Sequence, residues 1–264
     1  MASSPFKLGR TWVSASLAIL IIVGMKYTIW PAIAQSSFEH QLQAIAWSPD
    51  GNFIAYSAGE DICTPDIPRE LVIINAVTKD HVHTLPLGEC VVIDLDWSPD
   101  SARLAGASWD NFGFQAWDAA SGQRILLGLG NAQGMLSIDW HPTLNQLLIA
   151  DVAGGGTIVN ATTGESLRGL AIPASRARWN PDGETIASVR HDLNYVFIER
   201  GLQEIVLTEL QLPALRLEWS PDGTKLATAS YDNAVKIWDT NTGQELASFS
   251  VLNIWDVRWH PNSR

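Results

Sequence analysis

Five of six spaced tryptophans directly follow an acidic or basic residue. The types and spacing of these charged residues make them the chain's main candidates for a metal site or for catalysis. The six positions hold Ala46, Asp96, Asp139, Arg178, Glu218 and Arg258. Neighbouring carboxylates such as Asp96 and Asp139 can bind a hard cation, but Ca²⁺ takes about six to eight oxygen ligands. Because the charges alternate in sign over the last four positions, ion pairs between repeats explain them better than a metal site.

The motifs of common enzymes are missing from the sequence. It contains no Gly-x-Ser-x-Gly, no His-Glu-x-x-His and no phosphate-binding glycine-rich loop between a strand and a helix. The run from Gly154 to Gly156 fits a hairpin turn, and the histidines are scattered along the chain. We therefore predict that the protein is not an enzyme and has no catalytic residue, metal ligand or cofactor.

The charged residues occur at equivalent places in a repeated sequence unit, so the fold of this unit determines where they lie. Trp-Ser-Pro-Asp or a variant recurs with spacings of 39 to 50 residues, at Trp47, Trp97, Trp140, Trp179, Trp219 and Trp259. Apolar and other residues alternate before each tryptophan, which indicates a β-strand, and a proline-containing turn follows. Further strands are predicted in the fifth repeat at 225–230, 234–239 and 245–249. Each repeat is thus a four-stranded sheet. Several such sheets can bury their apolar faces against one another by packing around an axis.

These repeats resemble the WD-repeat (WD40) β-propeller family. The resemblance rests on Ala116-Trp117-Asp118 and Ile237-Trp238-Asp239, which close the third strands of the second and fifth units, and on Ser-Pro-Asp-Gly at 48–51 and 220–223. It implies that the tryptophans of these two units are braced by a network of structural residues: Ser108, Asp110 and Trp117 in one, Ser230, Asp232 and Trp238 in the other.

The resemblance implies an all-β propeller of four-stranded antiparallel blades. Five blades are complete and the first strand of a sixth follows, with starts near residues 43, 92, 135, 175, 215 and 255. Blades 3 and 4 lack the Trp-Asp pair and should rely on apolar packing. The single strand of the sixth unit has two explanations: a chain truncated at its C-terminus, or a five-bladed ring with one extra edge strand.

In the family's layout, the loops after the second and the fourth strand of each blade emerge on one face, here called the top face. Trp109, His191 and Tyr231 fall in such loops of blades 2, 4 and 5, and Trp255 begins the last unit. Since large aromatic residues often anchor protein interfaces, these four residues are the predicted partner-binding rim. The alternative is that each ring packs over its own turn.

The layout also brings Cys63 and Cys90, the two cysteines of the chain, to loops of the top face. In an exported protein an even number of cysteines favours a disulfide between them. Two thiols too far apart to pair are the alternative.

Residues 1–34 have the features of a signal peptide. Lys7 and Arg10 precede the apolar stretch 14–23, and Ala32-Ile33-Ala34 is a small-x-small cleavage pattern, so we expect cleavage after Ala34 and a propeller that spans 35–264. An uncleaved anchor over residues 12–33 is the alternative. In both cases the propeller is exported, to the periplasm, the cell surface or the medium.

The charge balance bears on the partner. Residues 1–34 hold three basic residues and no acidic one, which leaves 14 basic and 28 acidic residues and a net charge of −14 in the predicted mature chain. Such a surface repels nucleic acid, and the chain has no cluster of lysine and arginine. We expect a non-catalytic, extracytoplasmic scaffold that binds a protein or peptide partner, with membrane contact only through an uncleaved anchor. The alternative is a secreted enzyme, or a ligand or metal sensor, that uses the central channel.

Overall fold

The fold is described from a computed structural model of the 264-residue chain. The described residues are 19–23, 42–59, 69–88, 90–109, 113–128, 134–190, 194–201, 203–209, 214–252 and 254–259. Most of the predicted signal segment lies outside these ranges, and so do Cys63, Asp110, His191 and the side chain of Trp255.

Five four-stranded antiparallel sheets follow one another along the chain, each with its strands in sequence order. Blade 1 contains β2 (Leu42–Trp47), β3 (Phe53–Ala58), β4 (Glu70–Asn75) and β5 (His81–Thr84). Blade 2 contains β6 (Val92–Trp97), β7 (Arg103–Ser108), β8 (Phe114–Asp118) and β9 (Arg124–Gly128). Blade 3 contains β10 (Met135–Trp140), β11 (Gln146–Asp151), β12 (Gly156–Asn160) and β13 (Ser166–Gly169).

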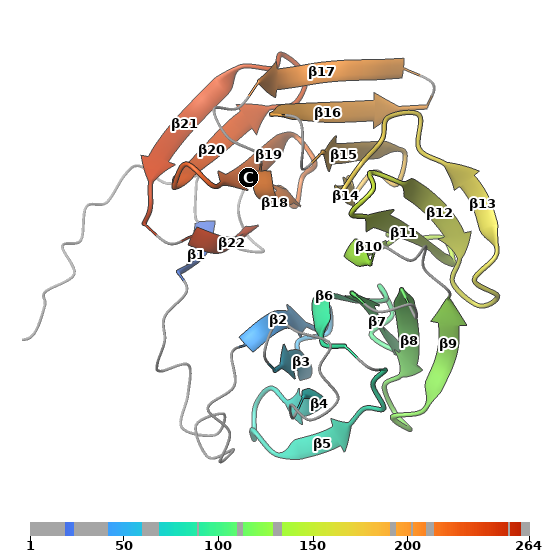
Figure 1. The fold of residues 1–264 in the computed structure, drawn as a ribbon. Coiled ribbons are helices and arrows are strands. Elements are labelled where there is room, and N and C mark those ends of the chain that lie inside the picture. The colour runs from blue at the N-terminus through green and yellow to red at the C-terminus, as the bar shows by residue number, and fades with distance from the viewer. Residues whose placement is uncertain are drawn as a thin grey trace, which may run out of the picture.

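Blade 4 contains β14 (Arg176–Trp179), β15 (Thr185–Val189), β16 (Tyr195–Arg200) and β17 (Gln203–Glu209). Blade 5 contains β18 (Ala214–Trp219), β19 (Lys225–Ser230), β20 (Ala234–Asp239) and β21 (Glu245–Ser250). The blades lie around a common axis, with the first strand of each on the inside and the fourth on the outside (Figure 1). The predicted all-β propeller with five complete four-stranded blades is confirmed.

The sixth unit contributes β22 (Ile254–Trp259), as the sequence predicts, and β22 pairs antiparallel with β1 (Ile19–Val23). β1 comes from the apolar stretch of the predicted signal segment, so cleavage after Ala34 would remove this partner strand. In the described part of the chain, no helix is long and apolar enough to cross a membrane.

The turn after each inner strand is built by its own side chains. In blade 1 the Ser48 hydroxyl donates to the Asp50 carboxylate at 2.6 Å and accepts the N–H of Phe53 at 2.9 Å. Gly51 takes the left-handed φ of 75° that closes this turn without a Cβ clash. The same bonds recur at Ser98 and Ser220, so each Ser-Pro-Asp motif marks a turn between the first and second strands of a blade.

The core lies between the blades. Five of the six anchor tryptophans are buried, each in the junction with the preceding blade: Trp97, Trp140, Trp179, Trp219 and Trp259. The indole Nε1 of Trp97 donates to the Ala46 carbonyl at 3.1 Å, and Trp219 does the same to Arg178 at 3.1 Å. Trp47 begins the series, has no preceding blade in the described part of the chain, and is 56% exposed. Burial of each tryptophan therefore depends on its neighbouring blade.

Candidate functional site

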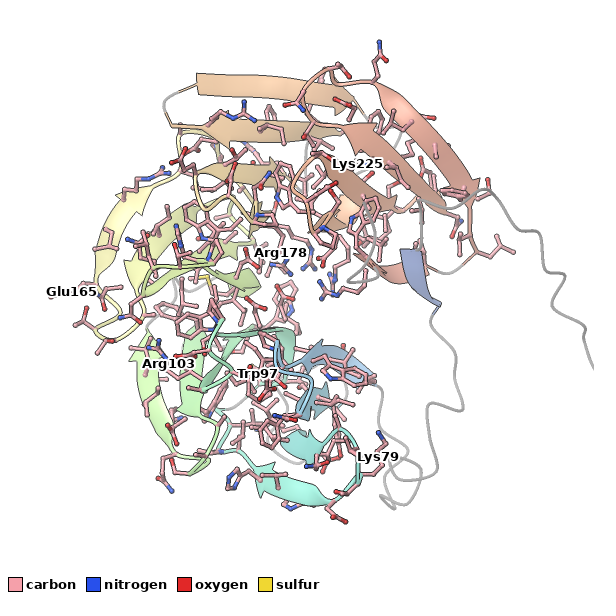
Figure 2. All side chains as sticks on the ribbon, turned by 180° about the vertical axis from the view of Figure 1, so that it is seen from behind. Lys79, Trp97, Arg103, Glu165, Arg178 and Lys225 are labelled. Carbon is pink, nitrogen blue, oxygen red and sulfur yellow. The ribbon has the colours of Figure 1, made fainter. Side chains whose placement is uncertain are left out.

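Arg178, near the end of the inner strand β14, joins three blades at the axis of the propeller. Its guanidinium Nη2 donates to both carboxylate oxygens of Asp94 in blade 2, at 3.0 and 2.8 Å. Its Nη1 donates to the Ser137 hydroxyl at 2.7 Å and to the Ile138 carbonyl at 3.0 Å, both in blade 3. Figure 2 shows Arg178 at the inner edge of the ring, whereas Glu165 lies at its periphery.

The inner carboxylates also hold neighbouring inner strands together. Asp94 accepts the N–H of Ile138 at 3.0 Å, and Asp96 accepts the N–H of Trp140 at 2.7 Å. In the next junction Asp139 accepts the N–H of Trp179 at 2.6 Å. Because these backbone donors face the adjacent blade and not their own sheet, each carboxylate serves as a clasp between blades.

Burial sets the electrostatics of this cluster. It raises the pKa of Asp96 to about 6, against the hydrogen bond from Trp140 and the charge of Arg178. Burial and the nearby Asp96 raise the pKa of Asp139 well above its usual value. Burial also opposes ionisation of Asp94, but the positive charges of Arg178, Arg216 and Arg176 together outweigh it and lower the pKa of Asp94. The pKa values of Asp96 and Asp139 are thus raised while that of Asp94 is lowered, so these neighbouring carboxyls differ in proton affinity.

The predicted ion pairs between repeats are present. Arg258 Nη1 lies 2.7 Å from Glu218 Oε2, and Arg178 Nε lies 3.9 Å from Asp139 Oδ1. Within the described ranges, no three histidine, cysteine or carboxylate side chains gather in a geometry that could hold a metal ion. The sequence pattern missed Asp94, although it lies on the same strand face as Asp96 and two residues before it.

Of the four residues of the predicted top rim, the structure describes the side chains of two, Trp109 and Tyr231. Trp109 follows β7 and is 45% exposed, and Tyr231 follows β19 and is 54% exposed. Both belong to turns between the second and third strands, so they lie on the same face, in blades 2 and 5. Trp109 packs against the backbone of Gly134, where an added Cβ would lie 3.0 Å from the Trp109 Cα. Trp109 thus combines local support with a large exposed area, and Tyr231 also presents a large exposed area.

The braced tryptophans differ between the two blades. In blade 5 the Ser230 hydroxyl donates to Asp232, which accepts the N–H of Ala234 at 3.1 Å, so this pair holds the turn. The indole of Trp238 donates to the hydroxyl of Thr228 at 3.0 Å, a residue that the sequence pattern does not single out.

Blade 2 has Gly106 where blade 5 has Thr228, and glycine offers no hydroxyl. The indole of Trp117 there donates to the Pro86 carbonyl at 3.0 Å. Trp117 itself is fully buried, and an added Cβ on Gly106 would lie 3.1 Å from its ring. The ring thus occupies the space that a side chain at position 106 would need. Ser108 is also buried, and its predicted partner Asp110 lies outside the described residues.

Cys90 is 2% exposed and is not a free thiol. Its predicted partner Cys63 lies outside the described ranges, so the disulfide stays a prediction.

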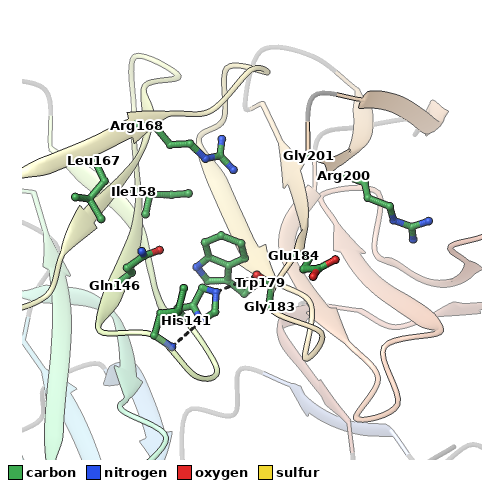
Figure 3. A pocket seen from close by; sticks show the side chains of 11 residues that line it. His141, Gln146, Ile158, Leu167, Arg168, Trp179, Gly183, Glu184, Arg200 and Gly201 are labelled. Atoms are coloured by element: carbon green, nitrogen blue, oxygen red, sulfur yellow. Dashed lines mark hydrogen bonds between the residues drawn. The ribbon is translucent and has the colours of Figure 1, made fainter.

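A cavity of about 560 Å³ opens between blades 3 and 4, on the face opposite to the top rim. We call it the 3–4 groove (Figure 3); its lining residues are His141, Leu144, Gln146, Ile158, Leu167, Arg168, Trp179, Gly183, Glu184, Arg200 and Gly201. They come from the turns after the first and third strands and from the strands β11, β12, β13, β14 and β16. Sequence reasoning did not find this groove.

His141 forms part of the wall between the two blades. Its Nδ1 accepts the N–H groups of Thr143 and Leu144, at 3.1 and 2.9 Å, which leaves Nε2 to donate to the Gly183 carbonyl at 2.9 Å. Burial lowers the pKa of His141. The imidazole is therefore a fixed, neutral link between two turns.

Comparison with known proteins places this architecture in a family. The model of the WD domain, G-beta repeat (WD40), matches residues 34–61, 79–112 and 213–239. The chain is 25% identical over 223 residues to the transcriptional corepressor LEUNIG_HOMOLOG of Arabidopsis thaliana, a match that covers 82% of this chain and 27% of that protein. It thus spans about a quarter of the length of this relative.

Among solved structures, the computationally designed Ika8 protein is similar, with a TM-score of 0.64 at 16% identity over 84% of this chain and 66% of that chain. This likeness concerns the fold alone. The architecture defines an all-β propeller. Together with the three matched repeats and the corepressor homologue, it supports a WD40 β-propeller.

Proposed function

We propose that this protein is a non-catalytic, extracytoplasmic scaffold that binds a protein or peptide partner with its top face. WD40 propellers generally bind protein partners. The observation that carries the proposal is the exposure of Trp109 and Tyr231, at 45% and 54%, on turns of one face. Exposed aromatic rings held by short turns contribute large contact areas at a small cost in conformational entropy.

The inner carboxylates support a binding role over a catalytic one. Asp94, Asp96 and Asp139 each accept a backbone N–H of the next blade, and Asp94 is also paired with Arg178. A general acid or base must reach a substrate proton directly or through one water molecule. These carboxylates are engaged in holding the inner strands instead.

The extracytoplasmic setting rests on the N-terminal sequence. Lys7, Arg10, the apolar stretch 14–23 and the Ala-Ile-Ala pattern at 32–34 together fit an export signal. Intact mass analysis of the protein from its host tests this setting. We expect a chain that starts at Gln35 in the extracytoplasmic fraction; a full-length chain recovered from the cytoplasm would contradict export.

The binding surface is tested by affinity capture from extracts of the host. We expect Trp109→Ala with Tyr231→Ala to reduce the recovery of specific partners at least about tenfold, because each ring supplies an interface anchor. Phe249→Ala is the matched control, since Phe249 is an aromatic residue of similar exposure, 42%, on the outer strand β21. Circular dichroism verifies that the variants fold. Equal partner recovery by the double variant and the wild type would refute the proposed surface.

A further inference from the structure

The strand β1 occupies the place of a second strand in the sixth unit. It pairs antiparallel with β22, and in the described part of the chain β22 has no other partner strand (Figure 1). Ile19 lies opposite Trp259. The residues opposite the anchor tryptophans of blades 1 to 5 are Ile54, Leu104, Leu147, Ile186 and Leu226. The register of β1 on β22 is therefore that of the complete blades.

A bulge in the pairing extends this match over the whole strand. In blades 1, 2, 3 and 5 the first strand skips one residue, four positions before its anchor tryptophan. β22 skips Trp255, which is also four positions before Trp259. Bulges of this kind are specific features of a strand pair. β1 thus follows the same template as the second strands of these blades.

The complete blades show which side chains this template accepts. The residue opposite the tryptophan is aliphatic and at most 3% exposed in all five blades. Four residues later, blades 1, 2, 3 and 5 have Ala58, Ser108, Asp151 and Ser230. A first strand therefore selects a large aliphatic residue at one end of its partner and tolerates a small or polar residue at the other. In β1 these two places hold Ile19 and Val23.

Blade 5 holds β22 in place through contacts that do not include β1. Ile254, Val257 and Trp259 pack in one buried cluster with residues of β19 and β20. Arg258 pairs with Glu218 at 2.7 Å, and the indole of Trp259 donates to the Glu218 carbonyl at 2.9 Å. The strand that pairs with β1 is therefore supported by its own side chains.

The backbone of β22 offers a row of hydrogen-bonding groups on the side of β1. Ile138 and Trp140, at the places equivalent to Val257 and Trp259, donate their N–H groups to the preceding blade. Because N–H groups alternate in direction along a strand, those of Asp256 and Arg258 face β1. Without β1 these groups form an open edge, which can pair with another chain.

We propose that the edge of β22 binds an extended aliphatic segment of another polypeptide once β1 has been removed. The segment adds as an antiparallel strand in the register of β1, with a large aliphatic residue opposite Trp259 and a small or polar residue tolerated four positions later. Backbone hydrogen bonds supply affinity and the alternate side chains supply specificity in this mode of recognition. The inference rests on the cleavage after Ala34 that the proposed function includes, and the uncleaved segment blocks the site.

The test starts from the full chain with a site for a specific protease placed between Ala34 and Gln35. The folded protein is digested, and the freed segment is removed by gel filtration. The probe is a labelled, capped Lys-Ile-Leu-Ile-Ile-Val-Lys peptide, which repeats β1 between two lysines, and its binding is followed by fluorescence polarisation. We expect saturable binding to the digested protein and none to the undigested protein. Absence of binding after digestion, or equal binding before and after it, would overturn the inference.

Variants of the peptide test the register. Serine at the place of Ile19 should weaken binding at least about tenfold, because a large aliphatic side chain leaves a buried place. Serine at the place of Val23 is the matched control and should change binding less than about twofold, since Ser108 and Ser230 fill this place in other blades. Equal losses for the two peptides contradict the proposed register.

Leu20→Pro exposes the same edge without proteolysis. Leu20 lies opposite Arg258, so its N–H faces β22, and proline has no N–H to donate. The full-length variant should therefore bind the peptide as the digested protein does, whereas Leu20→Ala keeps the donor and should leave the site blocked. Circular dichroism verifies that both variants fold. A folded Leu20→Pro protein that binds no peptide contradicts the inference.

A disulfide trap locates the bound peptide. Ile21 lies directly opposite Val257, so a peptide with cysteine at the place of Ile21 should form a disulfide with Val257→Cys in the digested protein. Ser248→Cys, on the exposed outer strand β21, is the matched control and should not react. Reaction with Ser248→Cys alone would place the peptide on blade 5 and refute the site. Light scattering that shows a dimer which excludes the peptide would also refute it, because a second copy would then occupy the edge.

This inference and the proposed function fail separately. Loss of peptide binding at β22 leaves the recovery of partners through Trp109 and Tyr231 unaffected. A chain that keeps residues 1–34 in its host contradicts export, but the affinity of the edge exposed by digestion is still measured.

Discussion

Replacing Arg178 by methionine tests whether the buried arginine holds the inner strands together. The change keeps a long unbranched side chain and removes the bonds to Asp94, Ser137 and Ile138. Asp94 is 3% exposed and would remain as a buried carboxylate that keeps the Ile138 N–H as its hydrogen-bond donor among the described residues. The main effect of the substitution is therefore a buried carboxylate that has lost its direct ion pair and keeps only the charges of Arg216 and Arg176 nearby.

The magnitude follows from this charge. Removing one partner of a buried ion pair costs about 3–5 kcal/mol, whereas removing both partners is often close to neutral. We expect Arg178→Met to lower the free energy of unfolding by about 3–5 kcal/mol at neutral pH. Asp94→Asn keeps an oxygen for the Ile138 N–H, so the double variant should recover about 2 kcal/mol or more of that loss.

The assay is a double-mutant cycle from urea unfolding, followed by tryptophan fluorescence and far-ultraviolet circular dichroism. The pH dependence has a definite sign. Arg178 lowers the pKa of Asp94 in the wild type, so this pairing stabilises the fold above the unfolded pKa and is lost as the pH falls through the folded value. The cost of Arg178→Met should therefore shrink from about pH 8 to about pH 5, as the buried Asp94 carboxyl of the variant takes up a proton. A cost below about 1 kcal/mol, or no recovery in the double variant, would refute the reasoning.

Two further substitutions test single interactions of the fold. Burial raises the pKa of Asp96 to about 6, so its ionisation destabilises the fold as the pH rises through that value. Asp96→Asn should raise the melting temperature at about pH 8 and have little effect at about pH 4; an equal effect at both pH values would contradict this. Thr228→Val removes the acceptor of the Trp238 indole and should cost about 1–3 kcal/mol in urea unfolding. Thr143→Val on an exposed turn is the control, at about 0.5 kcal/mol; a similar small loss at Thr228 would rule out the proposed bond.

The sequence predicts the blades well because the information is local. A tryptophan, a Ser-Pro-Asp turn and alternating apolar residues recur within each unit, and every turn is closed by its own serine and aspartate. Ion pairs between adjacent inner strands are also predictable, since equivalent positions of neighbouring repeats must lie side by side.

Other features depend on distance and side-chain length. Asp94 and Arg178 are 84 positions apart and belong to blades that are not adjacent, so no comparison of neighbouring repeats links them. The 3–4 groove is a second feature of this kind. The start of the second strand holds a different residue in each blade, Phe53, Arg103, Gln146, Thr185 and Lys225, and this comparison does not show where a cavity opens. Nor does the alignment give the edge-on contact of His141 with Trp179 in the wall of the groove.

The bond between Asp94 and Arg178 also limits how this gene can change by duplication. Repeat proteins usually gain or lose units easily, since each unit contacts only its neighbours. Here the bond spans blade 3, and it needs one blade, and no more, between its two partners. An inserted copy of blade 3 would move Arg178 out of reach and leave two buried charges unpaired. We therefore expect blades 2 to 4 to behave as one block, in which an added repeat is tolerated less well than elsewhere in the propeller.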